Sequence, residues 1–181
     1  KGDNKMFVGR IYRFINKGST TRSLSIYPTT ATANGTNVVL RGTSATDTAQ
    51  QWIWTSQKRL VCVKNALCLD RYNSSSSTQH NNADIWKCLD SEDANQELAY
   101  EDYGTYIKIK LKATNLYLTA YNSASGSVAG NTVTSSGNVY WATSSSSNYQ
   151  RWEAVLMGNN NYRWPTESRN VTNEYTESSH L

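Results

Sequence analysis

The sequence repeats a short closing pattern three times, and this repetition constrains the fold more than any other feature. In each copy a glutamine is followed two positions later by a large apolar residue: Gln50-Gln51-Trp52, Gln96-Glu97-Leu98 and Gln150-Arg151-Trp152. The closing residues stand at positions 52, 98 and 152, so the steps are 46 and 54 residues. A recurring period of this length indicates one supersecondary unit used several times.

Ahead of each closing pattern, short apolar runs with alternating polar residues predict strands. These runs are 11–16, 23–26 and 37–40 in the first copy, 60–63, 67–70 and 83–86 in the second, and 106–111, 116–119 and 139–141 in the third. The stretches between them are rich in Gly, Asn, Ser and Thr, which favour turns. With the closing pattern as its fourth strand, each copy is a four-strand unit. Three such copies predict an all-β barrel with three-fold pseudosymmetry.

Charge and hydropathy argue against two classes of partner. The formal net charge is +4, but lysines and arginines are scattered singly, whereas nucleic-acid binders gather them on one face. No run approaches the roughly 18 apolar residues of a membrane-spanning helix. The chain has 12 tyrosines and 6 tryptophans, whose rings suit amphipathic ligands and also half-buried strands.

The three closing patterns at this spacing resemble those of the ricin-B-type lectins, whose fold is the β-trefoil. The resemblance covers residues 7–156 and implies a lectin domain at 1–156 with three pseudo-symmetric repeats, at about 7–55, 58–101 and 104–156. Leu98 departs from the pattern, which has Trp at this position. Because that Trp packs inward in the family, Leu98 is expected to be a smaller apolar plug.

The middle repeat carries the groups that a sugar requires. A carboxylate accepts hydrogen bonds from hydroxyls, a carboxamide donates and accepts them, and a flat aromatic ring can lie under the apolar face of a pyranose. Asp70, Asn95 and Trp86 supply these groups. The resemblance implies that they are the acid, the amide and the stacking platform, with Gln96 as a brace behind them and Asp84 near the rim.

Each of these residues also has a purely structural interpretation. A surface Asp after a strand often forms a turn, and a Trp in a strand is often part of the core. Strand alternation sends Ile85 and Trp86 to opposite faces, so Trp86 faces outward if Ile85 fills the barrel. In the loop between the strands, His80 and Asn82 are candidate additional sugar contacts, although a solvated loop position is the default for His80.

The other two repeats lack this combination. Ser25 stands where Asp70 would be in the first repeat, with Arg41 near the platform position, and this repeat is expected to be inactive. Thr119 takes the acid position in the third repeat, where Trp141 remains a candidate platform. A hydroxyl lacks the charge-assisted strength of a carboxylate. We therefore expect one site, in the middle repeat, with the third repeat as a second candidate.

Two of the three cysteines flank the loop of the middle repeat. Cys68 and Cys88 are 20 residues apart, and the resemblance implies that they form a disulfide that closes this loop; two unlinked buried thiols are the alternative. A bridge would indicate an oxidising compartment, hence a secreted or extracellular protein. Cys62 alternates with Val61 and Val63 and is expected to be a free, buried thiol.

Residues 157–181 are expected to be a linker or tail. Tyr162-Arg163-Trp164-Pro165, followed by His180, resembles the start of a lysostaphin-type zinc endopeptidase domain. His180 would be a zinc ligand only if the rest of such a domain followed, because a catalytic zinc needs about three protein ligands. A disordered polar tail is the alternative.

The sequence thus predicts a non-enzymatic carbohydrate-binding module without cofactor or metal, recognising galactose-type or cell-wall glycans. Its expected role is to target a larger secreted protein, with no nucleic-acid partner and no membrane span. Two histidines, His80 and His180, and no recognisable catalytic motif argue against a hydrolase. The alternatives are an accessory fragment of a cell-wall zinc endopeptidase and a trefoil protease inhibitor or interaction scaffold.

Overall fold

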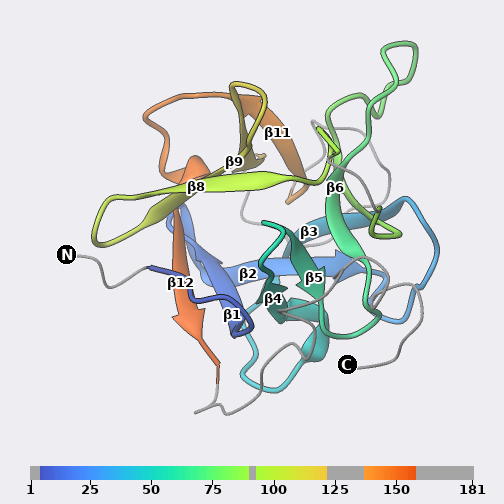
Figure 1. Ribbon diagram of the computed structural model, residues 1–181. Helices are drawn as coiled ribbons and strands as arrows, with labels where there is room; N and C mark the ends of the chain where they lie inside the picture. The colour runs from blue at the N-terminus through green and yellow to red at the C-terminus, as the bar shows by residue number, and fades with distance from the viewer. Residues whose placement is uncertain (1–4, 90–92, 122–136, 158–181) are drawn as a thin grey trace.

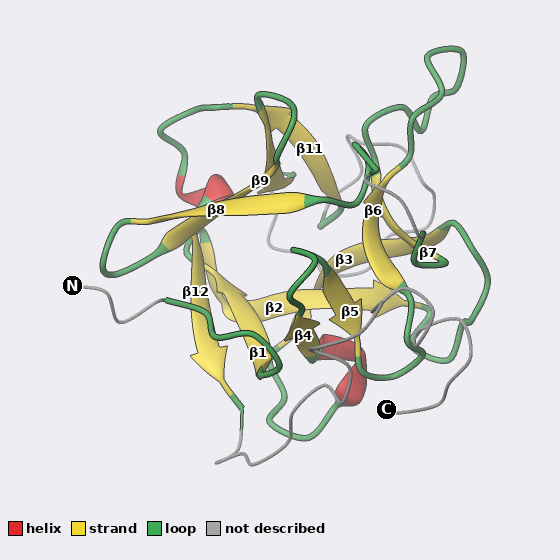
Figure 2. Cartoon of the chain, viewed as in Figure 1, coloured by secondary structure: helices red, strands yellow, loops and turns green. Residues whose placement is uncertain are grey.

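The computed structural model describes residues 5–89, 93–121 and 137–157, and within them the regular secondary structure is almost all β-strand, joined by loops (Figures 1 and 2). The predicted tail beyond residue 157, with His180, lies outside the described residues. Two 3-10 turns, η1 (Thr48–Gln50) and η2 (Asn148–Gln150), precede the last strands of the first and third repeats. The described strands are β1 (Ile11–Asn16), β2 (Ser19–Tyr27), β3 (Thr36–Gly42) and β4 (Trp52–Trp54); β5 (Leu60–Cys62), β6 (Cys68–Arg71), β7 (Ala83–Trp86) and β8 (Leu98–Asp102); and β9 (Ile107–Leu111), β10 (Leu116–Ala120), β11 (Val139–Thr143) and β12 (Trp152–Leu156).

The first and last strands of the three repeats form the barrel. Antiparallel pairings join β1 to β4, β4 to β5, β8 to β9, β9 to β12 and β12 to β1. The ring is completed between β5 and β8 by a hydrogen bond of 2.9 Å from the Leu98 amide to the Lys58 carbonyl. A closed ring of strands leaves its apolar side chains facing one interior.

The middle strands of each repeat form hairpins, β2–β3, β6–β7 and β10–β11, which meet each other in a cyclic arrangement. Asn37 of β3 pairs with Asp84 of β7, Asn82 pairs with Tyr140 of β11, and Asn138 pairs with Val39 of β3. Asn37, Asn82 and Asn138 are therefore equivalent positions in the three repeats. Each of them pairs with a residue of another repeat that lies two positions after that repeat's own asparagine. This relation establishes the three-fold pseudosymmetry residue by residue.

The closing tryptophans lie in the core under these hairpins. Trp52 and Trp152 are fully buried, and their indole N–H groups donate to the carbonyls of Leu24 (3.2 Å) and Leu118 (3.0 Å). Leu98, 1% exposed, takes the same place in the middle repeat. The barrel, the three hairpins and the pseudosymmetry define a β-trefoil, as the sequence predicts.

Candidate functional site

Three buried glutamines show which residues of the three repeats are equivalent. Gln50, Gln96 and Gln150 each use the side-chain amide to donate to a main-chain carbonyl at the end of the hairpin, that of Gly42 (2.6 Å), Lys87 (3.0 Å) and Thr143 (2.7 Å), respectively. The equivalent residues just before these anchors are Arg41, Trp86 and Ala142. The platform position therefore holds a tryptophan only in the middle repeat.

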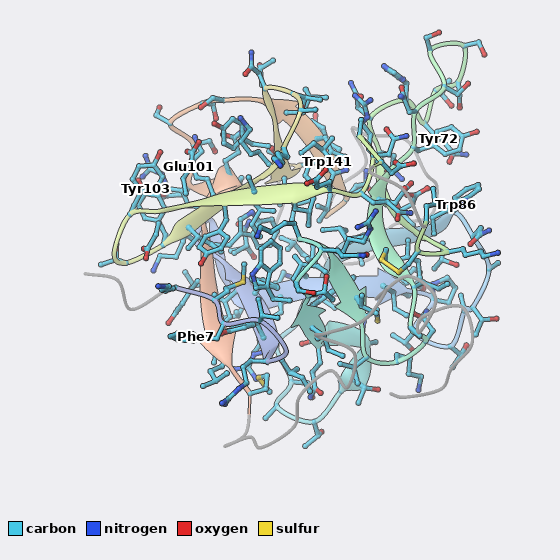
Figure 3. All side chains as sticks on the ribbon, in the orientation of Figure 1. Phe7, Tyr72, Trp86, Glu101, Tyr103 and Trp141 are labelled. Carbon is cyan, nitrogen blue, oxygen red and sulfur yellow. A yellow bond between two sulfur atoms is a disulfide. The ribbon has the colours of Figure 1, made fainter. Side chains whose placement is uncertain are left out.

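This register corrects the prediction for Trp141. Trp141 corresponds to the buried Ile85, not to Trp86, and is itself only 1% exposed. Its indole N–H donates to the main-chain carbonyl of Asp70 at 3.2 Å. In Figure 3, by contrast, Trp86 lies at the edge of the molecule. Trp141 is a core residue and not a sugar platform.

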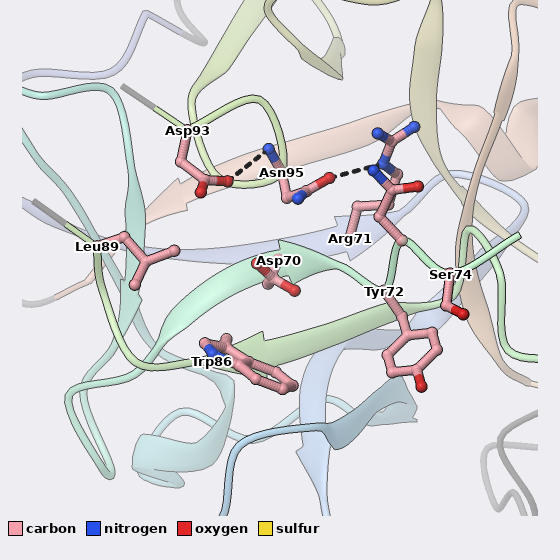
Figure 4. Close-up of a pocket in the computed structure, with 9 residues that line it drawn as sticks. Asp70, Arg71, Tyr72, Ser74, Trp86, Leu89, Asp93 and Asn95 are labelled. Atoms are coloured by element: carbon pink, nitrogen blue, oxygen red, sulfur yellow. Dashed lines mark hydrogen bonds between the residues drawn. The ribbon is translucent and has the colours of Figure 1, made fainter. Parts of the chain in front are cut away.

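The middle repeat contains an open pocket of about 270 Å³. Figure 4 shows the Asp70 carboxylate at its centre, with Trp86 on one side and Asn95 on the other. Strand β6 supplies the acid, strand β7 supplies the ring, and the turn before β8 supplies the amide. The pocket is lined by Asp70, Arg71, Tyr72, Asn73, Ser74, Trp86, Leu89, Asp93 and Asn95.

Asp70 is more buried than the sequence suggests, with 5% of its surface exposed. Gln96, fully buried behind it, donates to Asp70 Oδ1 at 3.2 Å and accepts from the Leu89 amide at 3.1 Å. The carboxylate is thus fixed before any ligand arrives, which lowers the ordering cost of binding.

Asn95 is held from two sides. Its main-chain amide donates to Asp93 Oδ1 at 2.8 Å, and its side-chain Oδ1 accepts from Arg71 Nε at 3.0 Å. Because the oxygen is engaged by Arg71, the amide nitrogen is the group that remains for a ligand. The pocket therefore offers an acceptor at Asp70 and a donor at Asn95.

Trp86 is half-buried at the end of β7, whereas Ile85 is fully buried, as strand alternation predicts. The turn before β3 lies against its ring. Gly35 has φ of +89°, a conformation that favours glycine, and a Cβ at this position would be 3.8 Å from Trp86 Cζ3. The ring is supported on that side and borders the pocket on another.

Asp84 lies directly opposite Asp70 in the β6–β7 pair and is 1% exposed, so it is not at the rim as expected. Burial, together with the hydrogen bond to Asp70 and the charge of Asp70, raises the pKa of Asp84 to about 10. Burial also raises the pKa of Asp70, to about 6, against the opposing effect of hydrogen bonds from Asp84 and Gln96. Both carboxyl groups are therefore harder to ionise than an ordinary aspartate, and Asp84 is the harder of the two.

The two loop candidates do not reach the pocket. Asn82 is 1% exposed and lies between its two counterparts, donating to Asn37 Oδ1 and accepting from Asn138 Nδ2, both at 2.7 Å. It connects the three hairpins instead of contacting a ligand. His80 is not among the residues that line the pocket.

Arg71, Tyr72 and Asp93 line the pocket but were not expected from the sequence. The available signals were the position of Arg71 directly after Asp70 and the spacing of Asp93 and Asn95, an aspartate two residues before an amide. The corresponding Asp47 and Ser147 accept hydrogen bonds from the amides two residues later in the other repeats.

The corresponding places in the other repeats have different chemistry. In the first repeat Arg41 occupies the platform position, with Nη1 2.7 Å from Asp47 Oδ2 and 3.3 Å from Ser25 Oγ. The third repeat has a cavity of about 230 Å³, but with Thr119 and Ala142 in place of the acid and the ring. In the described part of the chain, only the middle repeat combines a carboxylate with a stacking platform.

The cysteine prediction is confirmed: Cys68 and Cys88 form a disulfide, and Cys62 is free and buried. Burial raises the pKa of the Cys62 thiol to about 12, so it is not a thiolate at neutral pH. The disulfide joins the start of β6 to the segment after β7 and so fixes the two strands that carry Asp70 and Trp86.

Replacing Cys68 and Cys88 by serine is expected to lower the free energy of unfolding by about 3 kcal/mol, because the closed 20-residue loop no longer restricts the unfolded chain. Urea unfolding of the double variant measures the change. The Cys62→Ala variant, which removes a thiol without opening a loop, is the control. An unchanged transition midpoint in the double variant would contradict a stabilising role for the bridge.

No group of three or more His, Cys, Asp or Glu side chains is placed to hold a metal ion within the described residues. No helix of the described part is long and apolar enough to cross a membrane.

Comparison with solved structures confirms the fold. The chain resembles a designed three-fold symmetric protein, ThreeFoil, with a TM-score of 0.64 and 24% identity over 80% of this chain and 97% of that one. It also resembles the C-terminal half of an earthworm R-type lectin solved with GalNAc (TM-score 0.59, 11% identity, 81% of this chain and 98% of that one). The trefoil lectin of the Vibrio vulnificus hemolysin, solved with N-acetyl-D-lactosamine, is similar at a TM-score of 0.59 and 14% identity over 85% of this chain and 99% of that one.

Other similar structures belong to longer chains. This chain covers 18% of a mosquitocidal holotoxin (TM-score 0.67, 16% identity, 84% of this chain) and 30% of an exo-β-1,3-galactanase from Clostridium thermocellum (TM-score 0.64, 19% identity, 82% of this chain). The sequence matches no protein-family model and no curated protein. At these identities the comparisons establish a β-trefoil and nothing narrower.

Proposed function

We propose that this chain is a carbohydrate-binding module with one sugar site, the pocket of the middle repeat. The observation that carries the proposal is the fixed Asp70 carboxylate set between the Trp86 ring and the Asn95 amide. The structural resemblance to trefoil lectins supports the proposal.

In the proposed complex a pyranose ring stacks on Trp86, two of its hydroxyls donate to Asp70, and one accepts from the Asn95 amide nitrogen. Pockets for drug-sized ligands are about 300 to 1,000 Å³, so the pocket, at about 270 Å³, suits a single sugar residue. The site then binds one terminal or branching sugar unit of a longer glycan.

The charges of the pocket favour a neutral sugar. Two acids, Asp70 and Asp93, line it against one cation, Arg71. A carboxylate or sulfate on the sugar ring would be repelled by these two acids. Galactose-type sugars are the first candidates, since two of the similar proteins were solved with GalNAc and N-acetyl-D-lactosamine, respectively. A neutral unit of a cell-wall glycan is the second.

The acid pair of the pocket is not arranged for hydrolysis. Glycosidases place two carboxyl groups about 5 to 9.5 Å apart, on either side of the scissile bond. Asp70 and Asp84 are instead direct register partners on adjacent strands, and Asp84 is buried behind the pocket. The proposed role is binding without turnover, as the targeting module of a larger secreted protein.

A single such site is expected to bind a monosaccharide with a Kd of about 1 mM, or roughly −4 kcal/mol. Useful affinity then requires repeated sites on the target surface or a second module in the same protein.

A glycan array probed with the chain coupled to a multivalent carrier tests the proposal. We expect signals from neutral glycans, galactose-terminated ones first, and much weaker signals where the same sugar carries sialic acid or sulfate. Absence of binding to every glycan would overturn the proposal, as would equal binding by the chain with Asp70 replaced.

Arg71→Ala is expected to weaken sugar binding about three- to tenfold, because it releases the Asn95 side chain that Arg71 Nε holds at 3.0 Å. Calorimetric titration with the best array glycan gives the change. Arg151→Ala, which removes an arginine from the third repeat, is the matched control and should leave the affinity unchanged. Unaltered affinity of Arg71→Ala would show that Asn95 does not depend on this contact.

A further inference from the structure

The β6–β7 hairpin places two aspartates directly opposite each other, Asp70 in the wall of the pocket and Asp84 buried behind it. Asp70 and Asp84 are register partners in an antiparallel pair, where opposing side chains lie close together. They are 5% and 1% exposed. The corresponding partner residues are Val39 in the first repeat and Tyr140 in the third, so the pair is a feature of the middle repeat alone.

The two acids differ in their hydrogen-bond partners. Asp70 accepts from Gln96 Nε2 at 3.2 Å and faces the pocket. Neither carboxyl oxygen of Asp84 receives a hydrogen bond from another described residue. An ionised Asp84 would be a buried charge without a donor, which is strongly unfavourable. A protonated Asp84, in contrast, has an acceptor directly opposite it, the Asp70 carboxylate.

We propose that Asp84 is a positioning residue that carries a proton and donates it in a hydrogen bond to the Asp70 carboxylate, so that sugar binding is confined to a window of pH. The inference rests on the proposed sugar site and adds its regulation. Asp84 does not touch the sugar; it acts through Asp70, fixing the oxygen nearer to it and leaving the other for the hydroxyls.

The groups around the pair set the limits of this window. Arg71 on β6 favours the ionised form of Asp70, and Asp93 before β8 opposes it. From the other packed strands, β3 places the neutral Asn37 opposite Asp84, and β11 supplies the Trp141 indole, which donates to the Asp70 carbonyl. No lysine or histidine of the described residues forms an ion pair with either acid.

On the acid side, protonation of Asp70 removes the charged acceptor. Because burial raises the pKa of Asp70 to about 6, binding should fall to half near pH 6 and be lost near pH 5. An ordinary surface aspartate would keep its charge down to about pH 4. On the alkaline side, the pKa of Asp84 near 10 means that the proton is lost there, and two adjacent carboxylates then repel each other.

The pair also affects stability in a defined direction. A carboxyl whose pKa is raised in the folded state binds a proton that the unfolded chain releases above about pH 4. Its contribution to the free energy of unfolding is therefore largest in acid and declines as the pH rises toward 10. The thermal midpoint of the chain should fall steadily between pH 5 and pH 9.

Asp84→Asn and Asp84→Val separate donation from simple packing. The asparagine amide still donates to Asp70 but does not titrate, so Asp84→Asn should bind sugar within about threefold of the unmodified chain at pH 7.5. This variant should still lose sugar binding near pH 6, but it should no longer lose binding near pH 10. Its thermal midpoint should no longer fall toward pH 9. Asp84→Val, which copies Val39, should bind at least tenfold more weakly. Glu153→Gln, an exposed acid-to-amide change on β12, is the control for net charge.

A ligand-free measurement keeps this inference distinct from the sugar-binding proposal. In a carboxyl ¹³C NMR titration of the unmodified chain, the Asp84 signal should stay at its protonated position from pH 4 to pH 8, while Asp70 titrates near 6. If Asp84 titrates near pH 4, the inference is wrong whatever the sugar result. If Asp84 stays protonated but no glycan binds at any pH, the pair stands and the sugar site fails. If Asp84→Asn and Asp84→Val bind equally well, Asp84 does not position Asp70.

Discussion

The Trp86→Ala variant is expected to lose detectable sugar binding while its thermal midpoint changes little, whereas Trp141→Ala is expected to unfold easily. Trp86 is half-buried and borders the pocket, so its removal takes away the stacking surface but opens no cavity in the core. Trp141 is 1% exposed within the main core. Deleting a buried aromatic side chain costs about 3 to 5 kcal/mol, a large part of the roughly 5 to 15 kcal/mol that stabilises a domain.

Calorimetric binding and thermal unfolding of both variants distinguish these roles. The contrary pattern would be a stable Trp141→Ala protein without sugar affinity and an unstable Trp86→Ala protein that still binds. That pattern would move the platform to the third repeat and remove the basis of the proposed site.

Asp70→Asn is expected to weaken binding by at least tenfold with the fold retained. The amide oxygen still accepts from Gln96, but one acceptor for the sugar hydroxyls is replaced by a donor and the charge is lost. Hydrogen bonds to a charged group contribute about 1.5 to 3 kcal/mol, which corresponds to roughly 10- to 150-fold in affinity. Titration with the best array glycan at pH 7.5 measures the loss.

Thr119→Ala is the matched control for this variant, because Thr119 occupies the same position in the third repeat and accepts from Gln150 at 3.1 Å. It should leave the sugar affinity unchanged. An equal loss in both variants would mean that the effect passes through the fold and not through the pocket.

The repeated closing pattern was sufficient to predict the fold. A buried glutamine two residues before an apolar plug recurs because each repeat needs the same anchor for its hairpin, so the pattern survives even where Leu98 replaces Trp. The Cys68–Cys88 bridge and the outward position of Trp86 also followed from the sequence, the first by resemblance and the second by alternation with Ile85.

The register of the third repeat could not be obtained from spacing alone. Sixteen residues separate Ser25 from Arg41 and Asp70 from Trp86, but 23 separate Thr119 from Ala142. Because the loop of the third repeat has a different length, spacing alone placed the platform at Trp141, one position before the true equivalent, Ala142. In a strand, a shift of one position exchanges core and surface. The asparagines at 37, 82 and 138, each four residues before the platform position, were the signal that would have corrected it.

The burial of Asp70 and Asp84 could not be predicted from the sequence either. An aspartate in a strand is usually exposed, and burial of Asp84 depends on the packing of β7 against β3 and β6. The same packing holds Asn82 between the hairpins, where it connects repeats instead of binding sugar.

The central claim is that sugar binds between Asp70 and Trp86, and the indole N–H signals of the tryptophans test it most directly. Trp52, Trp54, Trp141 and Trp152 are buried in the core, whereas Trp86 borders the pocket. When galactose or N-acetylgalactosamine is added in millimolar amounts to the ¹⁵N-labelled chain, the Trp86 signal should shift in a saturable manner and the four core signals should not. A saturable shift elsewhere with Trp86 unchanged, or no shift with any neutral sugar, would contradict the account.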